Sequence, residues 1–114
     1  MTNVTQLIAS AKQHIPFTNQ ASAQGFLNQY GVDDQAALIS ALYIGRDHIH
    51  DSSIRADYVP SGMAFDRFFQ TGDASKWLIN PSEFARILYE KNTNASVYFD
   101  AFLRCVPAPS LANF

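Results

Sequence analysis

The sequence predicts an all-α domain, a compact single-domain bundle of five to seven short helices around a central apolar helix at about residues 33–45. Apolar residues recur every three or four positions in several segments, which is the helical period. The segments are separated by Asn, Asp, Gly and Pro, residues that start or stop helices. No segment alternates apolar and polar residues for long enough to predict a strand. With 114 residues, 47% of them hydrophobic, the chain suits one domain with its own core.

Two helices are predicted in the first thirty residues. The first runs from about Asn3 to His14 and ends before Pro16, because apolar residues recur at helical spacing at Val4, Leu7, Ile8, Ala11 and Ile15. Asn19 can cap a second helix, whose apolar face consists of Ala23, Phe26, Leu27 and Tyr30. We expect Gly31 to close this helix in the left-handed conformation.

The third helix, residues 33–45, is predicted to be the central one. Asp33 and Asp34 suit its first turn, where the helix dipole favours negative charge. The positions that follow are apolar nearly all round, which is typical of a helix buried on every side: Leu38, Ile39, Ala41, Leu42, Tyr43 and Gly45.

The second half of the chain predicts four more helical segments. Ser61 can cap a helix that carries Phe65, Phe68 and Phe69 and stops at Gly72, and Asp73 can cap a short helix around Trp77–Ile79. In Asn80-Pro81-Ser82-Glu83, the Asn is a favoured cap, Pro fits the first turn and Glu can complete a capping box before Phe84, Ile87 and Leu88. The last helix carries Tyr98, Ala101, Phe102 and Cys105, with Asn94 as cap and Pro107 as stop. Residues 1–106 are thus predicted as the helical domain, and 107–114 as a C-terminal tail that is frayed or lies on the surface.

Charge and hydropathy argue against two classes of partner. The formal net charge is −2, so the chain offers no electrostatic footprint for nucleic acid or for an anionic membrane. Residues 77–85 could resemble a helix-turn-helix, but the acidic Glu83 would lead its reading helix. The longest apolar runs are too short to span a bilayer, and the first residues lack the pattern of a signal peptide. A cytoplasmic location is therefore expected.

The polar stretch after the central helix is the first candidate site. His48-x-His50-Asp51 contains metal-ligand types, but ligands two apart share a face only on an extended segment, so a loop with solvated histidines and no metal is expected. Arg46 can interact with the carbonyl end of the central helix. An alternative is that Arg46, Arg55 and Arg67 converge on an acidic ligand.

Catalytic motifs are missing from the sequence. There is no G-x-S-x-G elbow, phosphate loop, dinucleotide fingerprint or H-E-x-x-H, and both Glu83 and Glu90 have explanations on helix surfaces. Cys105 lies among apolar residues, which predicts a buried, inert thiol. We therefore assign no catalytic residue, no metal ligand and no cofactor, and we favour a protein that is not an enzyme.

Aromatic residues are numerous: the chain has nine Phe, five Tyr and one Trp. A domain of this size has limited interior, and aromatic side chains exposed together tend to mark interfaces. The residues expected to remain partly outside are Phe65, Phe68, Phe69, Tyr89, Tyr98 and Phe99. The alternative is one unusually aromatic core.

Residues Gln35–His48, "QAALISALYIGRDH", resemble the middle helix of a small bacterial family of uncharacterised proteins, in which an apolar run ends in Gly-Arg-Asp or Gly-Arg-Gly. The resemblance implies an all-helical bacterial domain and assigns no functional residues.

Two hypotheses of function follow. The first is a non-enzymatic protein-interaction module, either a homodimer or an accessory or immunity-type partner of another protein, with no nucleic acid or membrane involved. The alternative is a domain that binds a small ligand or metal, or an enzyme, with a site around Arg46–Asp57. Its binding residues would be Arg46, Asp47, His48, His50 and Arg55.

Overall fold

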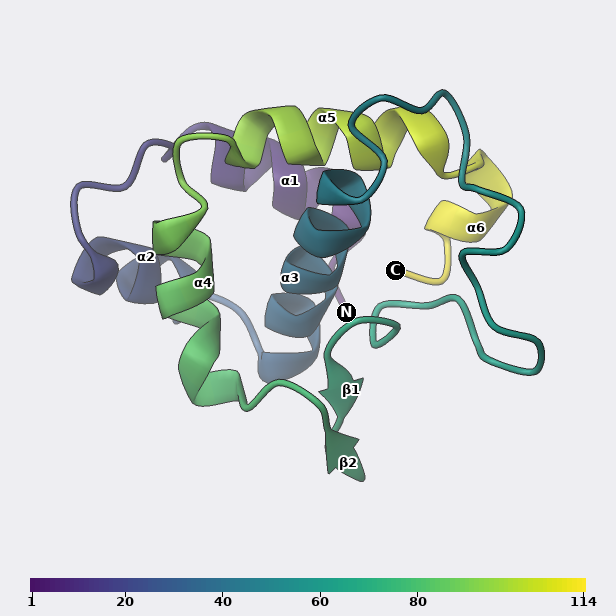
Figure 1. Cartoon of the computed structure of the whole chain (residues 1–114). Helices are drawn as coiled ribbons and strands as arrows, with labels where there is room; N and C mark the ends of the chain where they lie inside the picture. Colours follow the sequence, from purple (N-terminus) through teal and green to yellow (C-terminus); the bar gives the residue numbers. More distant parts are fainter.

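A computed structural model describes all residues, 1–114, and contains six α-helices, one 3₁₀ turn and one short hairpin (Figure 1). The elements are α1 (Val4–Lys12), α2 (Gln20–Leu27), α3 (Val32–Arg46), β1 (Gly72–Asp73), β2 (Lys76–Trp77), η1 (Pro81–Glu83), α4 (Phe84–Glu90), α5 (Ala95–Cys105) and α6 (Ala108–Leu111). The predicted helical class is confirmed. The radius of gyration is 13.1 Å, close to the value of about 13 Å expected for a compact domain of this size.

Helix α3 is the centre of the core, as predicted. Ten of its 15 residues are buried, and α1, α4 and α5 all pack against it (Figure 1). Leu42, in the middle of the helix, is fully buried. Gly45 lets α5 approach α3 very closely, since a Cβ added at this position would overlap the carbonyl oxygen of Tyr98. The α3–α5 crossing therefore depends on a glycine at position 45.

Asparagine caps start several helices. The Asn19 side chain accepts a hydrogen bond from the Ser22 N–H, and the Asn80 side chain accepts one from the Ser82 N–H at 2.9 Å, as predicted. The proposed capping box at Glu83 is wrong, because its carboxylate instead accepts a hydrogen bond from Arg86 Nε at 2.7 Å. Gly31 does not close α2 in a left-handed conformation either; its φ of −66° is ordinary, and it precedes α3 as the N-cap.

Residues 47–71 form a long connection without a regular helix (Figure 1). The helix predicted after Ser61 is wrong, because this backbone makes only isolated turns, such as Phe69 N–H to the Asp66 carbonyl, and otherwise bonds to distant partners. The Arg67 N–H donates to the Asn113 carbonyl, and the Gln70 N–H donates to the Ser40 hydroxyl. The aromatic rings diverge accordingly: Phe65 contacts Phe69, while Phe68 contacts Trp77.

The hairpin and the C-terminal residues also differ from expectation. The short helix predicted around Trp77–Ile79 is an antiparallel hairpin, in which Gly72 pairs with Trp77. Gly72 has a φ of +71°, a conformation that glycine adopts readily. Residues 107–109 are exposed, but Phe114 is buried at 2% exposure between Phe65 and Phe102, so the expectation of a frayed or surface tail is wrong for this residue.

Helix α5 begins after Asn94 and stops before Pro107, at the predicted positions, although the Asn94 side chain makes no capping bond. None of the helices combines the length and the apolar composition that crossing a bilayer requires.

Candidate functional site

His48 is buried, contrary to the expectation of a solvated loop. It follows the end of α3, and its side chain turns into the core with no exposed surface. Its Nδ1 lies 2.8 Å from the Ile44 carbonyl oxygen, and the Arg55 N–H donates to its Nε2 at 3.2 Å. These partners define a neutral imidazole with the proton on Nδ1. His50, two residues later, is exposed, so the two rings do not face a common ion.

The backbone around His48 is also tied to α5. The Cys105 thiol, buried as predicted, donates to the Asp51 carbonyl oxygen at 3.3 Å. Arg104 Nε donates to the same carbonyl at 3.0 Å. No group of three His, Cys, Asp or Glu side chains is placed to hold a metal ion. The turn at residues 48–51 is therefore held by the α3 and Arg55 backbone on one side and by side chains of α5 on the other.

Asp47 anchors the connection from the other side. The Tyr58 hydroxyl donates to Asp47 Oδ2 at 2.7 Å, and Gln70 Nε2 donates to the same hydroxyl at 2.7 Å. Burial and the neighbouring Asp47 carboxylate together raise the pKa of Tyr58 well above its usual range. The Tyr58 and His48 rings pack edge to face, with 4.4 Å between their centroids. Tyr58 thus remains a neutral hydrogen-bond donor and does not act as a base at ordinary pH.

Of the three arginines considered as a convergent anion site, Arg46 and Arg55 both reach Asp47, whereas Arg67 lies elsewhere. Arg46 lies over the Tyr43 ring at 4.8 Å and pairs with Asp47 at 3.4 Å. Arg55 donates to the Asp47 carbonyl oxygen at 2.6 Å. Arg67 pairs instead with Asp34 at 2.7 Å. None of the hollows on the surface is lined by residues 46–57. The polar segment is thus a network of internal bonds around the start of a long connection.

The predicted interface aromatics separate into core and surface. Phe99 is fully buried and Phe69 is 8% exposed, so both belong to the core. Tyr98 is half-buried on α5, and Tyr89 is 36% exposed on α4. Phe65 and Phe68 are half-buried in the 47–71 connection, where they line hollows in the surface. Only these last two of the six predicted aromatics combine partial exposure with a place in a concave part of the molecule.

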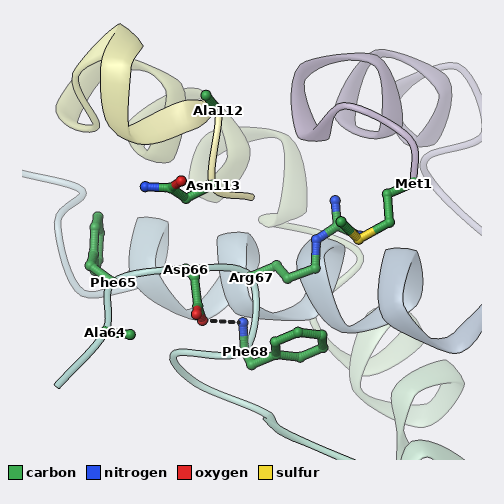
Figure 2. Close-up of a pocket in the computed structure, with 8 residues that line it drawn as sticks. All are labelled: Met1, Ala64, Phe65, Asp66, Arg67, Phe68, Ala112 and Asn113. Atoms are coloured by element: carbon green, nitrogen blue, oxygen red, sulfur yellow. Dashed lines mark hydrogen bonds between the residues drawn. The ribbon is translucent and has the colours of Figure 1, made fainter.

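Two adjoining hollows share Ala64, Asp66 and Phe68, and we call them together the Phe68 groove. The first, of about 520 Å³, lies among residues from both ends of the chain and from the connection (Figure 2): Met1, Ala64, Phe65, Asp66, Arg67, Phe68, Ala112 and Asn113. The second, of about 260 Å³, extends toward the hairpin and is lined by Met63, Ala64, Asp66, Phe68, Phe69, Gly72, Asp73, Lys76 and Leu78. Sequence patterns indicated its phenylalanines and, as part of a different site, Arg67. The rest was not predicted, because the groove is formed by a loop and a hairpin where helices were expected.

Arg67 is the buried charge of this groove. It is 4% exposed; one terminal nitrogen donates to Asp34 Oδ1 at 2.7 Å and the other to the Thr2 carbonyl oxygen at 3.0 Å. Its Nε–H has no hydrogen-bond partner. Burial alone would raise the pKa of Asp34, but the hydrogen bonds from Arg67 and the Thr2 backbone outweigh it and hold that pKa below its usual value. The pair is therefore ionised, with one donor left over.

Comparisons of the chain with protein families, with characterised proteins and with solved structures found no match.

Proposed function

We propose that this protein is a non-enzymatic interaction module that binds a partner protein through the Phe68 groove. The observation that carries the proposal is the gathering of exposed apolar side chains around a concave surface. Met63 is 44% exposed and Leu78 is 60% exposed. Both line the smaller of the two hollows, together with Phe68. Apolar surface that is both concave and contiguous is typical of recognition sites.

The alternative site around Arg46–Asp57 receives less support. Its buried groups already bond to one another, as the two nitrogens of His48 do with Ile44 and Arg55. Its half-exposed groups, Asp47 and Tyr58, face each other and line no hollow. A ligand there would have to break existing bonds, whereas a ligand in the Phe68 groove would cover apolar surface. A cytoplasmic location and a partner that is either another protein or a second copy complete the proposal.

Affinity capture from the cells that produce the protein tests this function, with wild type, Leu78→Ser and Val97→Ser as baits. Val97 is the matched control because it is 55% exposed but lies on α5, outside the groove. We expect one or more proteins to be captured by wild type and by Val97→Ser and to be lost with Leu78→Ser. Identical sets of proteins for the three baits would contradict the proposal.

A further inference from the structure

We propose, resting on the function above, that the occupant of the Phe68 groove is a segment of another protein that carries apolar side chains beside a lysine or arginine. A main-chain carbonyl of this segment accepts the free Nε–H of Arg67. Three features define this occupant: the apolar lining of the groove, the charge beside it and its buried, unpartnered donor.

The two hollows of the Phe68 groove hold two carboxylates and two cations, and the acidic excess that selects a basic segment comes from the hollow beside them. A third hollow, lined by Met1, Gly31, Val32, Asp33 and Asp34, adjoins the first at Met1. Along the three hollows the carboxylates outnumber the cations, with Asp33, Asp34, Asp66 and Asp73 against Arg67 and Lys76. Asp34 is in an ion pair with Arg67, and Asp73 lies opposite Lys76 across the hairpin. Asp33 and Asp66 are therefore the carboxylates that have neither an ion pair nor a cation opposite them. A lysine or arginine in the partner would supply that cation, and an acidic partner would be repelled.

Arg67 selects the polar group. Its Nε–H is shielded from water and bonds to nothing, whereas buried donors in proteins are nearly always paired. Asp34 already balances the charge of the guanidinium, so a neutral oxygen suits this donor better than a second carboxylate. Figure 2 shows the guanidinium beside Met1, at one side of the hollow. Met1 is 93% exposed, so packing does not hold this side of the hollow in place when a segment binds.

The same features disfavour a second copy as the occupant. In a two-fold dimer the groove would meet itself, because such an interface uses the same surface on each subunit. Asp66, which lines both hollows and forms no ion pair, would then approach its own copy and repel it. Two hollows in succession along the groove instead suit two apolar side chains of a single segment.

Selection from a phage-displayed library of random peptides on the folded full chain tests the occupant without assuming its sequence. We expect enriched peptides with two large apolar residues and at least one lysine or arginine. A synthetic copy of an enriched peptide is then titrated by calorimetry. We expect about tenfold weaker binding to Leu78→Ser and to Asp33→Lys. Asp57→Lys is the matched control, since Asp57 is exposed, forms no ion pair and lies outside the groove; its binding should stay at the wild-type level.

The donor has its own readout in ¹⁵N NMR spectra, which resolve arginine Nε–H signals. With the Arg67 signal assigned by through-bond correlations, saturating peptide should shift it, while the Nε–H signal of Arg104, bonded to Asp51 on the α5 side, should stay in place. An unmoved Arg67 signal would overturn the carbonyl contact.

The outcomes also separate this inference from the proposed function. Acidic peptides, no enrichment, or equal binding to all three variants would overturn the segment proposed here. If the capture of a cellular protein still depends on Leu78, the proposed interaction function stands even though the inference about a basic segment fails. A dimer in sedimentation that Leu78→Ser abolishes would make a second copy the occupant and would likewise overturn the inference.

Discussion

His48 shows how a residue that reads as a ligand in the sequence becomes a support of the fold. The pattern His-x-His does not show which of the two rings is buried. The partners of the His48 ring are backbone groups of Ile44 and Arg55, and backbone groups leave no signal in the sequence. The Ile44 contact is local, because Ile44 lies in the last turn of α3, four residues before His48. The Arg55 contact depends on how residues 49–54 return to the core, which no local pattern specifies.

Replacing His48 by Leu should therefore destabilise the protein by about 2–5 kcal/mol, since it leaves the Ile44 carbonyl and the Arg55 N–H without their partner in a buried place. Urea denaturation measures the change. His50→Leu is the control, and its effect should stay within about 0.5 kcal/mol because His50 is exposed. Equal effects of the two changes would contradict the structural role of His48.

The Asp34–Arg67 pair makes a second prediction at this scale, on pH. Because the pKa of Asp34 is lowered on folding, its contribution to stability is fully present above the usual Asp pKa and is lost as pH falls through the folded value. Asp34→Asn should cost about 3–5 kcal/mol at pH 7, since it leaves the Arg67 charge uncompensated. The difference from wild type should shrink below about pH 4. Denaturation at several pH values measures it, and a difference independent of pH would refute the assignment.

At the scale of elements, the sequence predicted the helices that bury one apolar face or are buried on every side. It did not predict the structure of the connection between residues 47 and 79. Helices α1, α3 and α5 follow from apolar spacing and from residues next to their ends, which are local properties. In contrast, the Phe65–Phe69 segment has an apolar spacing compatible with a helix, yet it folds around distant partners such as Ser40 and Asn113. Tertiary contacts override local preference there.

The crossing of α3 and α5 supplies the prediction for this scale. Gly45→Ala should destabilise the protein by about 1–3 kcal/mol or more, because the new methyl group would overlap the Tyr98 carbonyl and push the two helices apart. Gly25→Ala is a matched control in α2, where nothing lies within 4 Å of the added carbon. It should stabilise by roughly 0.5–1 kcal/mol through helix propensity. Thermal unfolding followed by circular dichroism measures both, and a gain at each position would disprove the close crossing.

For the whole molecule, the aromatic surplus was a useful but ambiguous signal. The number of aromatic rings, compared with the limited interior volume, predicted that some rings would stay outside, which holds for Tyr89 and in part for Phe65, Phe68 and Tyr98. It could not tell which, because Phe99 and Phe114 pack in the core through contacts set by the assembled fold. The candidate groove needs both chain ends beside the 63–78 segment, an arrangement visible only in three dimensions.

The last prediction concerns the state of association. The groove carries Asp66, a carboxylate without an ion pair, and the exposed apolar side chains outside the groove are scattered: Val32 lies at the start of α3, Ile49 after α3, Tyr89 on α4 and Val97 on α5. A stable two-fold dimer needs one self-complementary patch of about 800 Å² on each subunit, and repulsion in the groove works against it there. We therefore expect a monomer in sedimentation equilibrium at micromolar concentration and low salt, for wild type and for Leu78→Ser alike.

Salt screens the repulsion between like charges, so a dimer that forms only at high salt would show that the groove does associate with itself once its charge is masked. A dimer at low salt would contradict the argument from charge, because it would show that burial of the apolar lining outweighs the repulsion between the carboxylates.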